Sequence, residues 1–167
     1  VKATKWWFDE MKWELIFLRT RQEIQGIDLD VREAYNHSVS GLTALTLKRK
    51  NFFLDGLDFD FDIGYIIGRY GLNDKASNRY DWDGNKLPAV SPYGGEQNNF
   101  PSDGRNRSNE LTSKLNLGYT IDKHHGINLN VYFDRNSLHP NDSLMDKALG
   151  FQSNFPSKMK TLTTGLS

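Results

Sequence analysis

Apolar and polar residues alternate almost without interruption along residues 57–68, LDFDFDIGYIIG. Leu57, Phe59, Phe61, Ile63, Tyr65 and Ile67 share one parity, and Asp58, Asp60 and Asp62 share the other. Successive side chains of an extended strand point to opposite faces, so a period of two predicts a strand with one apolar and one acidic face. The carboxylates require water, whereas the apolar ladder requires either a protein core or lipid.

The same alternation recurs along the chain and predicts about seven strands. It is found in residues 11–17, 27–31, 45–48, 57–67, 111–121 and 127–133, and the tail from Met159 is expected to add a further strand. No stretch has a convincing helical period of apolar residues. The pattern therefore predicts an all-β, antiparallel fold.

The connections between these strands differ greatly in length. Tight reversals are expected at Gln25-Gly26, at Asp55-Gly56 and at residues 122–126, DKHHG. In contrast, residues 73–109 and 137–157 form two long polar connections. Loops beyond about 12–15 residues are uncommon in compact domains and usually carry function. The long connections fall on one side of the predicted sheet and the tight turns on the other, except that the connection near Asn36 is short.

Short turns at one rim and long loops at the other are typical of a transmembrane β-barrel of the outer membrane. In such a barrel the apolar parity faces lipid, and the polar parity faces a hydrated lumen. The residues expected to face the lumen are Asp58, Asp60, Asp62, Asn128 and Asn130. Seven strands cannot enclose a wide pore, so residues 1–167 are predicted to form part of a larger barrel. A soluble β-sandwich or jelly roll also alternates and is the competing interpretation.

Composition narrows the choice of class. The chain has 167 residues, no cysteine and a formal net charge of zero, which indicates neither a nucleic-acid-binding protein nor an electrostatic membrane-surface binder. Mean hydropathy is −0.65 and no apolar run is long enough for a membrane-spanning helix. The chain has no signal-peptide pattern, begins without Met and stops without a turn or cap, so we expect a segment of a longer polypeptide.

Three stretches resemble the barrel of TonB-dependent outer-membrane receptors, especially those of Bacteroidetes-type bacteria. They are KNFFLDGLDFDFDIGYIIGRYGLND at residues 50–74, NRYDWDGN at residues 78–85 and RSNELTSKLNLGYTIDKHHGINLNVYFDRNSLHPND at residues 107–142. In that family a turn, a strand and a large external loop follow one another in this order. The resemblance covers roughly residues 41–167.

The resemblance implies an energy-coupled importer of a scarce nutrient, such as a glycan, a peptide or a metal chelate, in the bacterial outer membrane. Such receptors have a barrel of about 22 strands closed by an N-terminal plug, and they are driven by the TonB protein. Outer-membrane lipid, TonB and a surface lipoprotein are the partners implied, with no nucleic acid. Neither a plug domain nor a TonB box is visible in residues 1–167. A passive porin-type channel or a soluble carbohydrate-binding β-domain are the alternative functions.

The first long connection contains the candidate ligand-binding residues. They are Arg79, Tyr80, Asp81, Trp82, Asp83 and Tyr93. Aromatic faces beside carboxylates are suited to gripping a glycan, a peptide or a chelate, although the same aromatic residues could instead pack the loop onto itself.

Other patterns do not amount to a chemical site. Asp81 to Asn85 faintly resembles a calcium loop, but Gly84 comes too early and no Glu follows at the twelfth position, so a turn is expected. His124 and His125 lie in a tight turn without a third ligand at suitable spacing. No motif of a catalytic nucleophile or a phosphate-binding loop is present. We therefore expect no enzyme activity, no metal and no cofactor.

Aromatic residues are plentiful and could form girdles at the membrane interfaces. The candidates are Trp6, Trp7, Trp13, Phe52, Phe53, Tyr65, Tyr70 and Tyr119. Ordinary packing explains any single one of them equally well.

Overall fold

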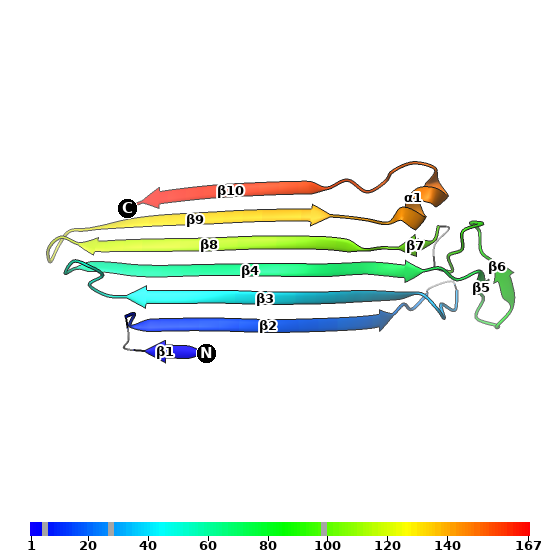
Figure 1. Cartoon of the computed structure of the whole chain (residues 1–167), viewed down its shortest axis with the longest axis horizontal. Coiled ribbons are helices and arrows are strands. Elements are labelled where there is room, and N and C mark those ends of the chain that lie inside the picture. Colours follow the sequence, from blue (N-terminus) through cyan, green and yellow to red (C-terminus); the bar gives the residue numbers. More distant parts are fainter. Residues whose placement is uncertain (5–6, 27–28, 98–99) are drawn as a thin grey trace.

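One long antiparallel sheet dominates the protein (Figure 1). The computed structural model describes residues 1–4, 7–26, 29–97 and 100–167. Its elements are β1 (Lys2–Thr4), β2 (Glu10–Glu23), β3 (Tyr35–Arg49), β4 (Leu57–Asp74), β5 (Asn78–Tyr80), β6 (Lys86–Pro88), β7 (Ser102–Asp103), β8 (Asn106–Thr120), β9 (Gly126–His139), α1 (Ser143–Leu149) and β10 (Ser157–Leu166).

The strands follow the order β1-β2-β3-β4-β8-β9-β10, with β7 paired to the end of β4. Apart from β4–β8, sequential neighbours pair along this path, as in an up-and-down meander. β4 is 18 residues long and β3 and β8 are 15 each, whereas strands of globular proteins commonly have about 5–6. The all-β, antiparallel prediction is confirmed. The described sheet is not closed, and β1 and β10 lie at its two edges (Figure 1).

Strand pairing extends the two faces of β4 across the whole sheet. Phe61 lies opposite Leu47 of β3 and Leu115 of β8, and Leu115 lies opposite Val131 of β9. Directly opposite residues place their side chains on the same face. We call the face that carries Phe61 the apolar face, and the face that carries Asp58, Asp60 and Asp62 the acidic face.

Asn128 and Asn130 lie on the acidic face, together with Asp58, Asp60 and Asp62. Asn130 is opposite Asn116, which is itself opposite Asp60. The Nδ2 of Asn116 donates to the Oδ1 of Asn130 at 2.6 Å. The polar residues of three neighbouring strands therefore form one continuous surface.

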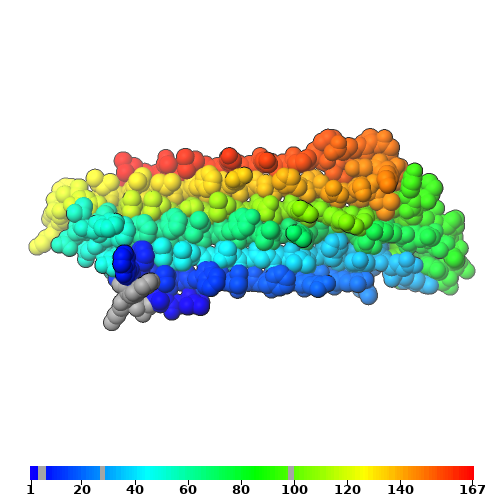
Figure 2. Space-filling model, viewed as in Figure 1, coloured from blue at the N-terminus to red at the C-terminus, as the bar shows by residue number. Residues whose placement is uncertain are grey.

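Neither face of the sheet is covered by a second layer within the described residues. The buried hydrophobic residues of this part of the chain are Ala34 and Ala76, and both lie in connections outside the strands. Figure 2 shows a long, narrow slab with the bulkier connections at one end. No helix in the described ranges has the length and apolar character needed to cross a membrane.

The tight turns lie together at one end of the sheet. Residues 50–56 join β3 to β4 and residues 121–125 join β8 to β9 at this end (Figure 1). Both reversals were predicted. The tight turn at Gln25-Gly26 was wrong, because β2 continues to Glu23 and β3 begins only at Tyr35.

The prediction of a strand over residues 27–31 was also wrong for residues 29–31, which are not in a strand. Residues 27 and 28 lie outside the described part of the chain. This correction removes the exception near Asn36. Residues 24–34 are one connection at the end opposite the tight turns, together with residues 75–105 and 140–156. The difference in length between the two ends is therefore consistent throughout.

The predicted long loops are shorter than expected, because strand structure extends into both. β4 continues to Asp74, β8 begins at Asn106 and β9 continues to His139. The second loop also contains a helix, α1, which the alternation did not predict. Asp142 caps its N-terminus and Gly150, with a φ of 78°, caps its C-terminus in the left-handed conformation that glycine favours.

The aromatic residues divide between the two faces. Tyr65 and Tyr119 lie on the apolar face, but Tyr70 lies opposite Ser38 and Asn106 on the acidic face. The rings of Phe52 and Phe59 are 4.7 Å apart at the tight-turn end. Trp6 is outside the described residues.

Candidate functional site

The three long connections meet beyond the ends of β4 and β8 and form the irregular part of the molecule (Figure 1). We call residues 24–34, 75–105 and 140–156, where described, the loop assembly. Loops held by a rigid sheet are common places for binding residues. The contacts that position this assembly are mainly those of buried carboxylates.

Asp74, the last residue of β4, fixes the first of these contacts. Its side chain is 1% exposed. Its Oδ1 accepts the backbone N–H of Glu96 at 2.8 Å, and its Oδ2 accepts that of Gln97 at 3.0 Å. A buried carboxylate requires such donors to offset its loss of hydration. The end of β4 thus anchors the far part of the 75–105 connection.

Glu96 carries the link onward to the first connection. It is also 1% exposed. Its Oε2 accepts the N–H of Arg32 at 3.1 Å, and its Oε1 accepts the N–H groups of Glu33, at 2.5 Å, and Ala34. Three successive backbone donors on one carboxylate form a charge-assisted set of hydrogen bonds. Glu96 therefore joins two connections that are far apart in the sequence.

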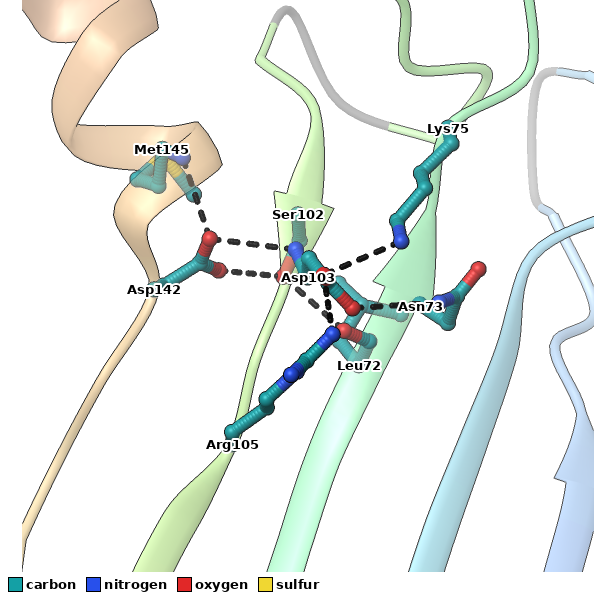
Figure 3. A network of polar contacts seen from close by, with 8 residues as sticks. All are labelled: Leu72, Asn73, Lys75, Ser102, Asp103, Arg105, Asp142 and Met145. Carbon is teal, nitrogen blue, oxygen red and sulfur yellow. Dashed lines mark hydrogen bonds and ion pairs between the residues drawn. The ribbon is translucent and has the colours of Figure 1, made fainter.

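Asp142 attaches the third connection in the same way (Figure 3). Its Oδ2 accepts the hydroxyl of Ser102 at 2.5 Å, and its Oδ1 accepts the N–H groups of Asp103 and Met145, both at 3.0 Å. The same side chain is therefore the N-cap of α1 and a tie to β7. The Oγ of Ser102 also lies 3.1 Å from the carbonyl oxygen of Leu72, so its single hydroxyl proton lies between two acceptors.

Asp103 lies beside this tie and pairs with two cations (Figure 3). Its Oδ2 is 3.0 Å from the Nζ of Lys75 and 3.0 Å from the Nη2 of Arg105. Burial acts to raise the pKa of Asp103, but the hydrogen bonds and positive charges of Lys75 and Arg105 together outweigh it and lower the pKa. Asp103 is therefore held as a carboxylate.

β4 and the segment after β7 approach closely at two glycines. A Cβ added to Gly71 would lie 1.8 Å from the carbonyl oxygen of Gly104. The N–H of Gly104 donates to the carbonyl of Leu72 at 2.8 Å. Only glycine fits at position 71, because any side chain would meet backbone there.

The hairpin of β5 and β6 carries most of the predicted ligand residues. The Nε of Arg79 donates to the carbonyl of Pro88 at 3.2 Å. The Tyr80 ring lies under the guanidinium of Arg32, with 3.9 Å from Cζ to the ring centroid. Arg79 and Tyr80 thus have structural contacts, and the first connection packs on this hairpin.

Asp81 to Gly84 form the hairpin turn, as expected for this sequence. The Oδ1 of Asp81 accepts the N–H of Asn85 at 2.7 Å, and its Oδ2 accepts the side-chain amide of Asn85 at 2.8 Å. The side-chain bond from Asn85 is the main cause of a lowered pKa of Asp81. Both carboxylate oxygens are directed to the turn itself.

Trp82, Asp83 and Tyr93 remain the outward-facing members of the predicted set. Trp82 is 63% exposed and Tyr93 is 51% exposed, and Asp83 is exposed as well. Trp82 and Asp83 lie on the hairpin turn, and Tyr93 follows in a turn in which the N–H of Gly94 donates to the carbonyl of Ser91 at 3.0 Å. These three predicted residues therefore present two aromatic side chains and one carboxylate to solvent.

Asp74, Glu96 and Asp142 were not singled out from the sequence, although they position the assembly. Acidic residues in polar loops are usually solvated, so their type alone carries no signal. Asp142 had a usable sequence signal, because an Asp, a short stretch and then Gly150 form the pattern of a helix capped at both ends. Asp74 and Glu96 had none, because their partners are distant backbone groups.

The histidine turn at the opposite end has a local structural role. Asp122 Oδ1 accepts the N–H groups of His124 at 2.7 Å and His125 at 2.9 Å, and these bonds, that of His124 first, lower the pKa of Asp122. Over the described ranges, no group of three His, Cys, Asp or Glu residues is arranged to hold a metal ion.

Comparison of the chain with models of known protein families, with curated proteins and with solved structures found no match. The class of the protein therefore rests on its own features. It is an all-β protein made of a single-layered antiparallel sheet with a loop assembly at one end.

Proposed function

We propose that the chain is a segment of an outer-membrane β-barrel, and specifically of a TonB-dependent receptor that takes up a glycan, a peptide or a metal chelate. The observation that carries the proposal is the apolar face, which no described protein layer covers. Leu15 and Phe17 on this face are 69% and 70% exposed. Burial of such side chains is worth about 1.5–3 kcal/mol each, so a large apolar face in water would be strongly unfavourable.

The height of the apolar face matches a bilayer. From Leu57 to Ile67, at about 3.3 Å per residue, the ladder of β4 is about 33 Å long. At the roughly 40° tilt of barrel strands this corresponds to about 25 Å, which is the usual height of the apolar band of an outer-membrane barrel. A soluble sandwich has no reason to keep apolar strands of this length.

The open edges support a larger barrel. β10 pairs only with β9, and in the described residues β2 pairs on its outer side only with the three residues of β1. Lipid cannot satisfy unpaired backbone groups, so strands in a bilayer must close into a barrel. Further strands beyond β2 and β10 would complete it.

The loop assembly would form part of the external, ligand-binding face. Trp82, Asp83 and Tyr93 are accessible there on a support held by Asp74 and Glu96. The resemblance of residues 41–167 to the receptor family is the basis for three further parts of the proposal. These are coupling to TonB, a plug domain and a surface lipoprotein partner. The acidic face would line the lumen.

A spin-label scan of β4 tests the membrane assignment. The chain has no cysteine, so single cysteines can replace each residue from Asp58 to Ile67 in turn. In bilayers, labels at 59, 61, 63, 65 and 67 should be accessible to oxygen, and labels at 58, 60 and 62 to a water-soluble nickel chelate. Protection of the apolar positions from both reagents would indicate a second protein layer and contradict the proposal.

Uptake measurements test the receptor assignment. In intact cells, Trp82→Ala and Tyr93→Ala should lower the affinity for the ligand, whereas Trp7→Ala, at the opposite end, should not. Uptake should also stop when the proton-motive force is dissipated. Uptake that continues without that energy would show a passive porin.

A further inference from the structure

The charges of the long strands are unevenly divided between the two faces, although the chain as a whole is neutral. The acidic face carries Lys12, Lys48 and Lys114 among its carboxylates. The basic residues on the apolar face are Arg19, Arg21, Arg49, Arg69, Arg107, Arg135, Lys158 and Lys160. Glu23 is the acidic residue of the long strands on that face, and the others lie on the acidic face. The net charge of zero therefore includes an excess of positive charge on the apolar face and of negative charge on the acidic face.

The basic residues gather at the end of the apolar face that is nearer the loop assembly. Register places Arg19 opposite Val39, Val39 opposite Arg69, Arg69 opposite Arg107, and Arg107 opposite His139 in one row. Arg21 and Lys158 lie in the two adjacent rows, whereas Arg135 and Lys160 lie two rows nearer the tight turns, in the row of Tyr65. We call this group, without Arg49, the cationic band.

The cationic band borders the apolar ladder on β2, β4 and β8 and runs beside the ladder's rows nearest the loop assembly on β9 and β10. Arg69 follows Ile67 on the same face of β4, and Arg19 follows Phe17 on the same face of β2. At the tight-turn end the apolar face has Arg49 alone, and its Nη1 donates to the carbonyl of Trp7. The positive charge of this face is thus concentrated at the end nearer the loop assembly.

The guanidinium groups of the band are free to bind a ligand. Arg19, Arg21, Arg69 and Arg107 are exposed, and no carboxylate of the described residues forms an ion pair with them. The guanidinium of Arg21 lies over the Tyr35 ring, 3.9 Å from Cζ to the centroid. That contact orients the side chain without neutralising it.

A hollow of about 400 Å³ lies beside Arg19 and Arg21, at the β2 side of the band. Arg19, Arg21, His37, Lys75 and Arg105 line it, and Asp103 is the one carboxylate in its lining. Asp103 is engaged with Lys75 and Arg105, so the positive charges of Arg19 and Arg21 remain uncompensated. The Nδ1 of His37 is buried and has no partner within the described part of the chain. The hollow is therefore suited to an anion with several oxygen atoms.

We propose that the cationic band binds the phosphate headgroups of an anionic lipid whose acyl chains lie along the apolar ladder. This inference rests on the proposed function, because it requires the apolar face to contact lipid. Arginine matches phosphate oxygens with paired hydrogen bonds, and a basic group near a membrane surface attracts anionic lipid. A lipid has an anionic headgroup for the cationic band and acyl chains for the apolar ladder, whereas an acidic protein would bind only the cationic band.

Lipid selectivity in detergent tests the proposal. The protein is offered equal amounts of phosphatidic acid and phosphatidylcholine with identical chains, and native mass spectrometry counts the bound lipids. We expect preferential retention of phosphatidic acid. Each arginine removed should lower the affinity of the protein for phosphatidic acid by about fivefold. The test variant is Arg69→Gln/Arg107→Gln, and Arg19→Gln/Arg21→Gln replaces it if that variant does not fold.

The matched control removes the same charge from the other face. Lys12→Gln/Lys114→Gln should keep the preference for phosphatidic acid. Equal binding of the two lipids, or equal losses in band and control variants, would overturn the proposal. Displacement of phosphatidic acid by inorganic phosphate would assign a simple anion site instead, and displacement by polyglutamate would assign a docking site for an acidic protein; either would overturn it.

The spin-label scan separates the two levels of inference. Alternating accessibility along β4 in phosphatidylcholine bilayers, without a preference for phosphatidic acid, would refute the cationic band alone. Loss of the alternation would refute the membrane assignment itself.

Discussion

Glu96 accepts the backbone N–H of Ala34, a residue 62 positions earlier in the chain. This bond and those from Arg32 and Glu33 tie the first two long connections together, beside the contacts of the first connection with Tyr80. The loop assembly is thus held by a carboxylate acting on backbone groups. Its rigidity depends on a few buried acceptors and very little on an apolar core.

Glu96→Gln should loosen the first connection. The amide side chain keeps one acceptor oxygen but replaces the other by a donor facing backbone N–H groups. We expect a loss of about 1–3 kcal/mol of local stability, measured as faster amide hydrogen exchange at Arg32, Glu33 and Ala34. Glu33→Gln, an exposed neighbour with the same change of charge, should leave exchange unaltered. Equal exchange in both variants would contradict the role of Glu96.

Asp142→Ala should release the third connection from β7 and fray α1. It removes an N-cap, worth about 0.5–2 kcal/mol, and also the acceptor for Ser102. Limited proteolysis should then cut within residues 140–156. Asp142→Asn, which keeps a capping oxygen, should be cut less, and Lys147→Ala, an exposed position of α1, should resemble the wild type. Resistance of the alanine variant would show that α1 is held by other contacts.

Acidification should loosen the Asp103 pairs. The pKa of Asp103 is lowered in the folded protein, so its contribution to stability is fully present above the unfolded pKa of about 3.9. It is lost as the pH falls through the still lower folded pKa. Pepsin cleavage within residues 75–105 should therefore increase below about pH 4. Asp103→Asn should remove this step, and a step of unchanged size in that variant would assign it to other carboxylates.

Phe61→Arg should destabilise the protein in a bilayer by about 2–4 kcal/mol, because Phe61 is near the middle of the apolar ladder. Asp60→Asn removes only a part-exposed pair with Lys48 at 3.0 Å and should cost under about 1 kcal/mol. Denaturant titration of the protein folded into lipid vesicles measures both. Small and equal effects would contradict the assignment of the two faces.

Gly71→Ala should disturb the attachment of β7. The added Cβ would meet the carbonyl of Gly104, and overpacking of this kind costs about 1–3 kcal/mol. Gly165→Ala is the matched control, since nothing lies within 4 Å of the added Cβ there. The same titration should show a loss for the first variant and almost none for the second. A tolerated Gly71→Ala would mean that the segment at Gly104 moves away easily.

The strands were predictable because their signal is local. The parity of residues 57–67 alone assigned Asp60 and Phe61 to opposite faces, and strand pairing confirms that assignment on the neighbouring strands. The false strand at residues 29–31 shows the limit of this signal. The alternation of residues 27–31 was read as a strand, but the described part of that segment is held by Glu96 and by the hairpin, through the N–H of Asp30 to the carbonyl of Tyr80 at 2.9 Å.

The loop residues were only partly predictable. The turn at Asp81 and Gly84 has a local pattern, and the exposed aromatic side chains follow from their polar surroundings. The buried state of Asp74 and Glu96 has no local signature, because their partners are backbone groups that the chain brings back from other connections.

From the sequence alone came the all-β, antiparallel class and the two unlike faces, since alternation is a property of each strand by itself. Only the tertiary structure decided which residues became neighbours. Arg69 and Arg107 are 38 positions apart, and only the register of β4 and β8 places them side by side. Pairing between strands depends on contacts distant in sequence, and for that reason the cationic band and the buried carboxylates appeared only when the sheet was assembled.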